Sequence, residues 1–401
     1  MGSNAVRTAL ALVGTVVVAI GVSGCGAEPD VPVAPDPVVD LAQLDVGGNA
    51  TKPHAYGTPK TLEQAKIVEA ERLANFIPLA SDIDPRFAHG YKLTSKVFFD
   101  PKYSDLGNAI KLEKFAETAP NFITGFASSG TTDPNVQGMD LMNVVMVFPD
   151  EQKAKDAVVA LERSDFEYSN RNQAVAIPKY PAAKAHWQPH EQSIGSWFAA
   201  GKLVVYSWVY DYLRIAASEV DLTTLVSLVE KSLDVVVPSI AKFTPTPPDQ
   251  LMNLPVDIDG MLGRTLPRIN EELFTNPPGV YTGLAGLHFS TTPIEARPAL
   301  EAAGVDRYAR DHAIIYRTRD VAAARKLLAH QAELNKKLRS VEPPNNLPQA
   351  KCQEYIGSDK YVIRFYCSVS YDRYVALVWS DQLVDLQQRM SAQYALLVNA
   401  E

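Results

Sequence analysis

The segment Gly201–Trp208, GKLVVYSW, appears again in pattern as Asp372–Trp379, DRYVALVW. Each begins with a turn residue and a base, continues with alternating apolar side chains and ends on tryptophan. Such alternation is typical of a β-strand. A helical pattern follows each segment, over 222–240 in the first case and 382–399 in the second. The chain therefore carries two copies of one strand-and-helix arrangement.

Two further matches extend this repeat toward the N-terminus. Phe122–Ala127, FITGFA, is echoed by Val280–Ala285, VYTGLA. The strand Met142–Phe148, so apolar that we expect burial on both faces, precedes an aspartate suited to cap a helix, and His312–Tyr316 precedes Asp320 in the same way. We predict an α+β fold of two tandem, internally repeated units, each β-β-α-β-β-α with helices packed on a mostly antiparallel sheet.

The borders of the two units follow from local signals. Thr61–Gln64 has the pattern of a capping box, which predicts a helix that begins there and ends before Pro78. Thr244–Pro248, TPTPP, interrupts every periodic pattern. We expect a first unit over 60–242, a proline-rich linker over 243–256 and a second unit over 257–401.

The N-terminal residues have the layout of a secretory signal peptide over 1–24. Arg7 precedes the apolar segment Thr8–Val22, which is shorter than the roughly 20 residues needed to cross a bilayer. Val22–Cys25, VSGC, resembles the bacterial lipobox. That resemblance implies diacylglyceryl attachment to the Cys25 sulfur, cleavage before Cys25 and acylation of the new terminus, for example by palmitate. Ordinary secretion with a free Cys25 is the alternative, and a permanent transmembrane helix is less favoured.

The residues after the lipobox are expected to form an acidic, proline-rich tether over 25–59 that holds the folded part away from the bilayer. A spacer without a tuned length is the alternative. The chain has 38 Lys and Arg residues, 46 Asp and Glu residues and a formal net charge of −8. This balance argues against nucleic acid as a partner and against nonspecific adsorption to an anionic membrane.

Two cysteines, Cys352 and Cys367, remain once the lipobox is set aside. The surrounding sequence indicates a hairpin over 351–369. If Asp359 and Lys360 centre its turn, the two cysteines are cross-strand neighbours. In an exported protein we expect such an isolated pair to form a disulfide bond. A redox-active or metal-binding pair is the less favoured alternative, because CxxC spacing is absent.

No catalytic signature occurs in the sequence: GxSxG, HExxH, a P-loop, an EF-hand loop and a GxGxxG before a helix are all missing. We therefore name no catalytic residue, cofactor or metal, and favour a non-catalytic protein while leaving enzymatic activity open. His186 and His190 have the spacing of two ligands on one helix face. Pro189 lies between them without a helical pattern, so we favour an exposed polar loop.

A basic segment and a set of aromatic side chains each have a functional and a purely structural interpretation. The segment Arg307–Arg339 is rich in bases and could bind acidic envelope polymers or lipid headgroups, but we favour a solvated helix face. Four aromatic side chains on the repeated strands could line an apolar groove, although sheet core is the favoured interpretation. They are Tyr206, Trp208, Tyr374 and Trp379.

With these features together, the chain resembles a family of lipoproteins of unknown function from mycolic-acid-containing actinobacteria. The resemblance covers most of the chain and rests on layout and short matches such as Thr124-Gly125 and Thr282-Gly283. It implies an envelope location and no activity. We expect a protein lipid-anchored on the extracytoplasmic face of the cell membrane, binding an envelope lipid, glycan or protein in a groove between its two units. An envelope hydrolase and a transporter's solute-binding lipoprotein with parallel sheets are the alternatives.

Overall fold

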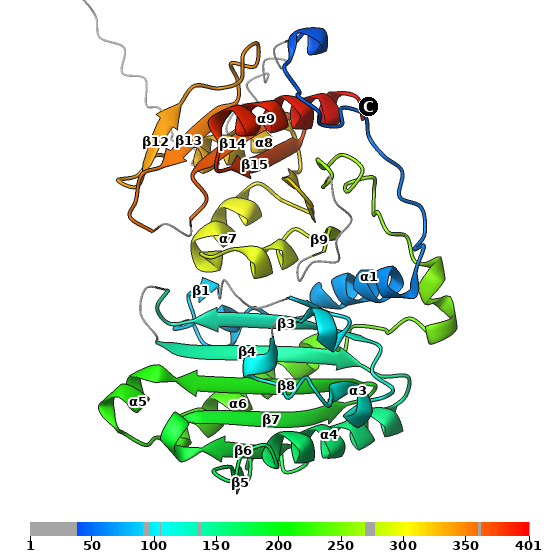
Figure 1. The fold of residues 1–401 in the computed structure, drawn as a ribbon, viewed down its shortest axis with the longest axis vertical. Coiled ribbons are helices and arrows are strands. Elements are labelled where there is room, and N and C mark those ends of the chain that lie inside the picture. The colour runs from blue at the N-terminus through cyan, green and yellow to red at the C-terminus, as the bar shows by residue number, and fades with distance from the viewer. Residues whose placement is uncertain are drawn as a thin grey trace, which may run out of the picture. The chain divides into compact units, whose positions relative to one another are not determined.

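The computed structural model describes residues 38–90, 96–104, 106–134, 138–268, 277–359 and 362–400. The predicted signal peptide and Cys25 lie outside this part of the chain. The first unit contains an antiparallel sheet of eight strands. Seven of them follow the order β1-β3-β4-β8-β7-β6-β5 (Figure 1), and β2 pairs with β3. Its strands are β1 (His89–Gly90), β2 (Val97–Phe98), β3 (Thr124–Thr131), β4 (Met139–Val147), β5 (Gln173–Val175), β6 (Lys184–Gln188), β7 (Ser193–Ala200) and β8 (Leu203–Asp211).

Helices cover both faces of this first sheet. The inner side of α4 shares a hydrophobic cluster with Trp197 and Tyr206, whereas α6 packs on the opposite face with Leu141 and Val205. All residues of β4 are buried, which confirms that this strand is covered on both sides. The helices of the unit are α1 (Leu62–Ala74), α2 (Ala80–Ile83), α3 (Phe115–Thr118), α4 (Glu151–Phe166), α5 (Tyr212–Ala217) and α6 (Leu222–Ile240).

The second unit contains a sheet of seven strands in the order β12-β13-β14-β15-β11-β10-β9. Helix α9 (Leu383–Val398) packs on one face, and α8 (Val321–Gln331) packs on the other beside α7 (Pro293–Ala302). The strands are β9 (Gly279–Thr282), β10 (Arg307–Arg310), β11 (Ile314–Arg317), β12 (Leu338–Val341), β13 (Lys351–Tyr355), β14 (Phe365–Tyr371) and β15 (Tyr374–Ser380).

The two sheets have the same strand order when each is followed from the edge formed by β1 or β9. All ladders between the described strands are antiparallel. The tandem, internally repeated α+β architecture is therefore confirmed. One detail of the repeat was wrong: β9, which contains the Thr282 of VYTGLA, occupies the place of β1, and the counterpart of β3 is β10.

Each unit has more strands than the predicted β-β-α-β-β-α. The strands β5 and β6 lie in a segment rich in turn residues, and β12 is a short edge strand. In β10 two of the four residues are arginines. Hydrophobic alternation is the main sequence signal for a strand, and none of these segments displays it clearly.

The two units share one hydrophobic cluster within a single compact body. The ring of Phe126 in β3 lies 5.1 Å from the ring of His288 and 6.5 Å from that of Tyr281 in the second unit. His288 also places Nε2 3.1 Å from the carbonyl oxygen of Ile77. Because these side chains are buried aromatics, their packing fixes the contact firmly.

The described part of the expected tether, residues 38–59, lies against the second unit. Leu44 is buried in the cluster of α9, and Asn399 donates to the carbonyl oxygen of Thr51 at 2.8 Å. The expected linker also has fixed contacts, since the backbone N–H of Thr246 donates to Glu69 of α1 at 2.7 Å. Among the described residues, no helix is long and apolar enough to cross a membrane.

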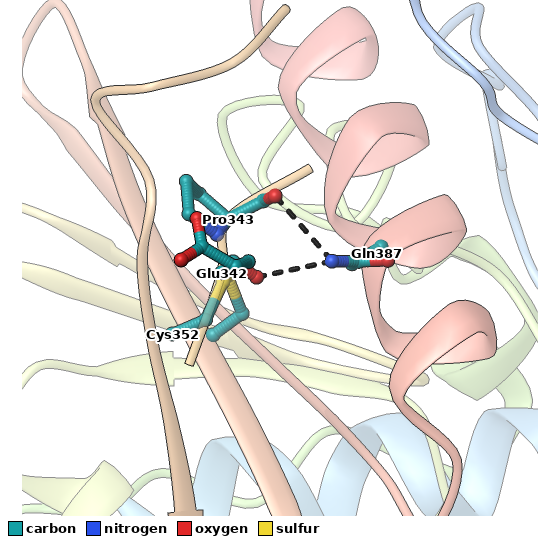
Figure 2. The surroundings of a disulfide bond; sticks show 5 residues. Glu342, Pro343, Cys352 and Gln387 are labelled. Carbon is teal, nitrogen blue, oxygen red and sulfur yellow. Dashed lines mark hydrogen bonds between the residues drawn. A yellow bond between two sulfur atoms is a disulfide. The ribbon is translucent and has the colours of Figure 1, made fainter. Parts of the chain in front are cut away.

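A disulfide bond joins Cys352 in β13 to Cys367 in β14. The two residues are direct cross-strand partners, which is the register predicted from the hairpin. Next to the disulfide, Gln387 of α9 donates to the carbonyl oxygens of Glu342 and Pro343 at 3.0 and 3.4 Å (Figure 2). The helix is thus tied to the segment that leads from β12 to β13.

Candidate functional site

A cavity of about 930 Å³ lies over the face of the second sheet that α8 covers in part. Its floor is formed by β10, β11, β13, β14 and β15, and α7 and α8 contribute to its walls. From the first unit it receives His89 and Pro134. We expected a groove between the two units, but this cavity is lined almost wholly by the second. Its volume is within the range of small-molecule sites.

Five lining residues form one row of cross-strand partners along the cavity floor. Each is paired with the next, so that the row crosses five adjacent strands. In order from the outer edge they are Lys351, Ser368, Leu377, Ile314 and Arg310. Because neighbouring strands lie about 4.8 Å apart, the row is roughly 19 Å long. The cavity therefore has the length of an extended ligand, with a cation at each end.

The first unit has the same row, with a different side chain at four of the five positions. Following its register gives the counterparts Lys184, Trp197, Tyr206, Val144 and Ala127. Trp197 and Tyr206 are fully buried there, with ring centroids 4.1 Å apart, and fill the space beneath α4. Their counterparts Ser368 and Leu377 are much smaller, and the corresponding face of the second sheet stays open.

The inner end of the row is Arg310, which is half-buried. Its guanidinium carbon lies 4.2 Å from the ring centroid of Phe289, a cation–π arrangement. Its Nε is buried and has no hydrogen-bond partner in the part of the chain that the structure describes. A buried donor without an acceptor is costly, and the half-buried guanidinium as a whole borders the cavity, where an anion could compensate its charge.

Behind Arg310 lies a buried carboxyl group from the first unit. The cross-strand partner of Arg310 is Gly279, and a Cβ at Gly279 would collide with the carboxyl group of Glu71 in α1. Burial raises the pKa of Glu71 well above its ordinary value, although the backbone of Val280 and the charge of Arg310 oppose this shift. The uncharged form of Glu71 is therefore favoured, so Glu71 compensates the positive charge of Arg310 only weakly.

The rest of the cavity is apolar and aromatic in the middle and basic at its outer end. Lys337 and Lys351 are exposed at that end, where Asp359 also contributes to the lining. Together with Arg310, the lining has three basic residues against one acidic residue in a protein of net charge −8. Six rings contribute to the lining beside aliphatic and uncharged polar side chains: Phe289, Tyr308, Tyr316, Tyr355, Tyr366 and Trp379.

The first unit has a smaller cavity of about 160 Å³ on the matching face of its sheet. His186 contributes to it from β6 and lies 3.5 Å from Glu162 and 3.7 Å from Asp165. Burial lowers the pKa of His186 to about 4 and raises the pKa of Asp165 to about 7. His186 is thus buried in a strand rather than exposed in a loop.

The other sequence candidates lie in several places. Among the described residues, no group of three or more His, Cys, Asp or Glu side chains is arranged to hold a metal. His190 is in a short 3-10 helix, Pro189–Glu191. Tyr206 is core, Trp208 borders the small cavity and Trp379 borders the large one, whereas Tyr374 packs against the α9 cluster. Cys25 is outside the described part.

The basic segment Arg307–Arg339 is not one surface. Arg307 pairs with Asp259 at 3.0 Å, Arg317 with Asp306 at 2.7 Å, and Arg339 donates to Glu354 at 2.6 Å. All three acids lie outside the segment, which explains why the segment looked unopposed. Arg310, by contrast, has no ion-pair partner within the described residues, and it was one base among many in the sequence.

The fold and the cavities define a tandem α+β protein whose first unit has a small cavity and whose second unit has a large one. The chain belongs to the DUF7373 family, a family described as domains of unknown function: its N-terminal model matches residues 56–256 and its C-terminal model residues 261–400. The matched segments agree with the two units of the structure. None of the curated proteins that were compared matches the chain.

Among solved structures, the chain is similar to the extracellular domain of PknH from Mycobacterium tuberculosis. The identity is 12%, the match covers 43% of this chain and 97% of that domain, and the TM-score is 0.31. At this level the likeness carries no argument about function, and the cavity has to be interpreted from its own residues.

Proposed function

We propose that this protein is a lipid-anchored, non-catalytic protein of the cell envelope that binds a small molecule in the cavity of its second unit. One observation supports this above all: Ser368 and Leu377 leave open the space that Trp197 and Tyr206 fill in the first unit. Unfilled apolar space lowers stability, so a folded domain gains nothing from a cavity of this size unless something occupies it.

The anchoring part of the proposal rests on Val22–Cys25. A lipid on Cys25 would place the protein on the extracytoplasmic face of the membrane, and an acyl anchor of two or more chains holds stably. Substituting Cys25→Ala should release the protein from membranes or block its processing, as measured by fractionation and by the mass of the mature chain. A Cys25→Ala protein that is correctly cleaved and still membrane-bound would refute the anchor.

Binding is favoured over catalysis because of what surrounds the cavity. Its histidines are His89 and His330, and His330 faces Glu333 with Nδ1 3.3 Å from Oε1. Among the described residues, no hydrogen bond joins a serine or threonine hydroxyl of the lining to either histidine. An activated nucleophile needs such a base within hydrogen-bond reach.

The binding proposal is tested with the full-length protein, extracted in copolymer particles so that no detergent enters the cavity. The variant S368W/L377Y copies the first unit's row and should fill the space. Native mass spectrometry should detect a retained molecule in the wild type and none in this variant. Val384→Trp, which adds bulk at a position that is 64% exposed and outside the lining, is the matched control. Equal occupancy of wild type and S368W/L377Y, or none in either, would refute binding here.

An envelope hydrolase remains the second candidate, and it would use the first unit. Asp165, with its pKa raised by burial to about 7, lies beside His186 and Glu162 and is suited to hold a proton near neutral pH. Assays of cell-wall substrates with Asp165→Asn decide the matter: a hydrolytic activity that this substitution abolishes would favour the enzyme. The solute-binding alternative predicted parallel sheets, whereas the described ladders are antiparallel.

A further inference from the structure

We propose that the ligand of the second unit's cavity is an anionic amphiphile, with a carboxylate or phosphate at Arg310 and an elongated apolar body along Leu377 and Ile314. This inference rests on the proposed function and names the ligand class. It uses three features of the row: its unpaired inner cation, its apolar middle and its length.

The anionic group follows from the surroundings of Arg310. The guanidinium is oriented by the Phe289 ring, its buried Nε lacks an acceptor, and no carboxylate pairs with it in the described part of the chain. A guanidinium presents parallel N–H groups that match carboxylate and phosphate. An anion at this end would compensate the charge of the guanidinium.

The choice of Arg310 over the outer cation follows from exposure. Lys351 is exposed to solvent, where salt and water weaken its interactions. Arg310 is half-buried, and an ion pair is stronger where less water surrounds it. The first unit has Ala127 at the position of Arg310, so the cation occurs in the copy with the large cavity and is absent from the copy whose cavity is small.

The apolar body follows from the middle of the row. Between the two cations lie Ser368, Leu377 and Ile314, with Tyr316, Tyr366 and Trp379 beside them. Rings and branched aliphatic side chains attract an acyl or other apolar chain by removing its surface from water. The row of roughly 19 Å favours a long chain over a short one.

The test uses full-length protein in neutral-lipid nanodiscs and displacement of a fluorescent fatty acid. Palmitate and a lysophosphatidate compare the two anionic groups, hexadecanol removes the charge, octanoate shortens the chain and a maltooligosaccharide represents glycans. Binding that persists in S368W/L377Y measures partition into the lipid and is subtracted. We expect displacement by palmitate, by the lysophosphatidate, or by both, and whichever binds more tightly identifies the source of the anion.

Arg310→Gln should weaken binding of the anion roughly ten- to hundredfold, Arg310→Lys less, and Lys351→Gln at most about threefold, since a charge-assisted contact of a half-buried side chain exceeds that of an exposed one. Arg307→Ala, in the same strand but outside the lining, should change nothing. If Arg310→Gln does not fold, the comparison of palmitate with hexadecanol on the wild type decides. Equal affinities there, or binding of the maltooligosaccharide alone, would overturn the anionic amphiphile and leave binding in the cavity intact. No saturable binding of any probe would refute both.

Discussion

Ser368 occupies in the second sheet the position that Trp197 holds in the first. Trp197 is the cross-strand partner of Tyr206, and Ser368 is the cross-strand partner of Leu377, the counterpart of Tyr206. Trp197 is fully buried, and its neighbour Tyr206 packs on it. The same place in two copies of one fold therefore serves as core in one copy and as the floor of a cavity in the other.

This difference predicts opposite sensitivities at the two positions. Trp197→Ala should reduce the free energy of unfolding by about 3–5 kcal/mol, because it removes a large buried ring. Ser368→Trp should reduce it by less than about 1 kcal/mol, since the ring enters existing space. Urea unfolding of the full-length protein measures both. A large loss from Ser368→Trp would mean that the cavity is smaller than the structure indicates.

Gly279 is expected to tolerate no side chain. A Cβ there would collide with the buried carboxyl group of Glu71, so Gly279→Ala should reduce the free energy of unfolding by about 1–3 kcal/mol. Gly48→Ala, where the added Cβ meets no atom within 4 Å, is the control. In a Glu71→Ala background the effect of Gly279→Ala should largely disappear. Additive losses in the double mutant would show that the two residues do not compete for space.

Asp165 predicts a specific dependence of stability on pH. Burial raises its pKa from 3.8 to about 7, so its contribution to stability is fully present below pH 3.8 and is lost as the pH rises through 7. Relative to Asp165→Asn, the wild type should lose up to roughly 4 kcal/mol over this range, at about 1.36 kcal/mol per pKa unit. Asp156→Asn, on the exposed side of α4, is the control. Parallel unfolding curves for wild type and Asp165→Asn from pH 4 to 7 would contradict the prediction.

The disulfide should contribute measurably to stability. It joins residues separated by 15 positions, and closing a loop of that size is worth about 3 kcal/mol in the chain-entropy model. C352A/C367A should therefore unfold at lower urea concentration, and a reductant should shift the wild type by the same amount while leaving the variant unchanged. If the reductant shifted both proteins equally, the effect would come from elsewhere. Ligand binding should persist, because both sulfurs belong to the α9 side of the sheet.

The sequence allowed much of the fold to be predicted because the central strands carry strong patterns. The apolar strand β4 and the repeated strands β8 and β15 were predicted, and the hairpin turn gave the register of Cys352 and Cys367. The strand β10 was missed because arginines occupy two of its four positions. The match of FITGFA with VYTGLA related β3 to β9, which do not occupy equivalent places in the two sheets. An edge strand as short as β9 has too few residues for its sequence pattern to identify its counterpart.

The cavity could not be predicted from one copy of the repeat. Leu377 by itself is an ordinary strand residue. Only a comparison with its larger counterpart Tyr206 indicates that space is left open at this position. The signal was present, since GKLVVYSW aligned with DRYVALVW places these two residues together. Transferring that alignment to Ser368 and Arg310 required the register of three further ladders. A groove between the units was expected instead because duplicated domains often bind ligands at their contact.

The disulfide fixes which side chains of β13 and β14 point into the cavity. Cys352 follows Lys351, and Cys367 precedes Ser368, so the bond fixes the outer two positions of the row opposite each other. In a β-sheet, a shift of one residue turns every side chain to the other face. A slipped β13–β14 pair would turn Ser368 toward α9 and a cysteine toward the ligand. The covalent bond forbids that exchange, whatever strain an incoming molecule places on the strands.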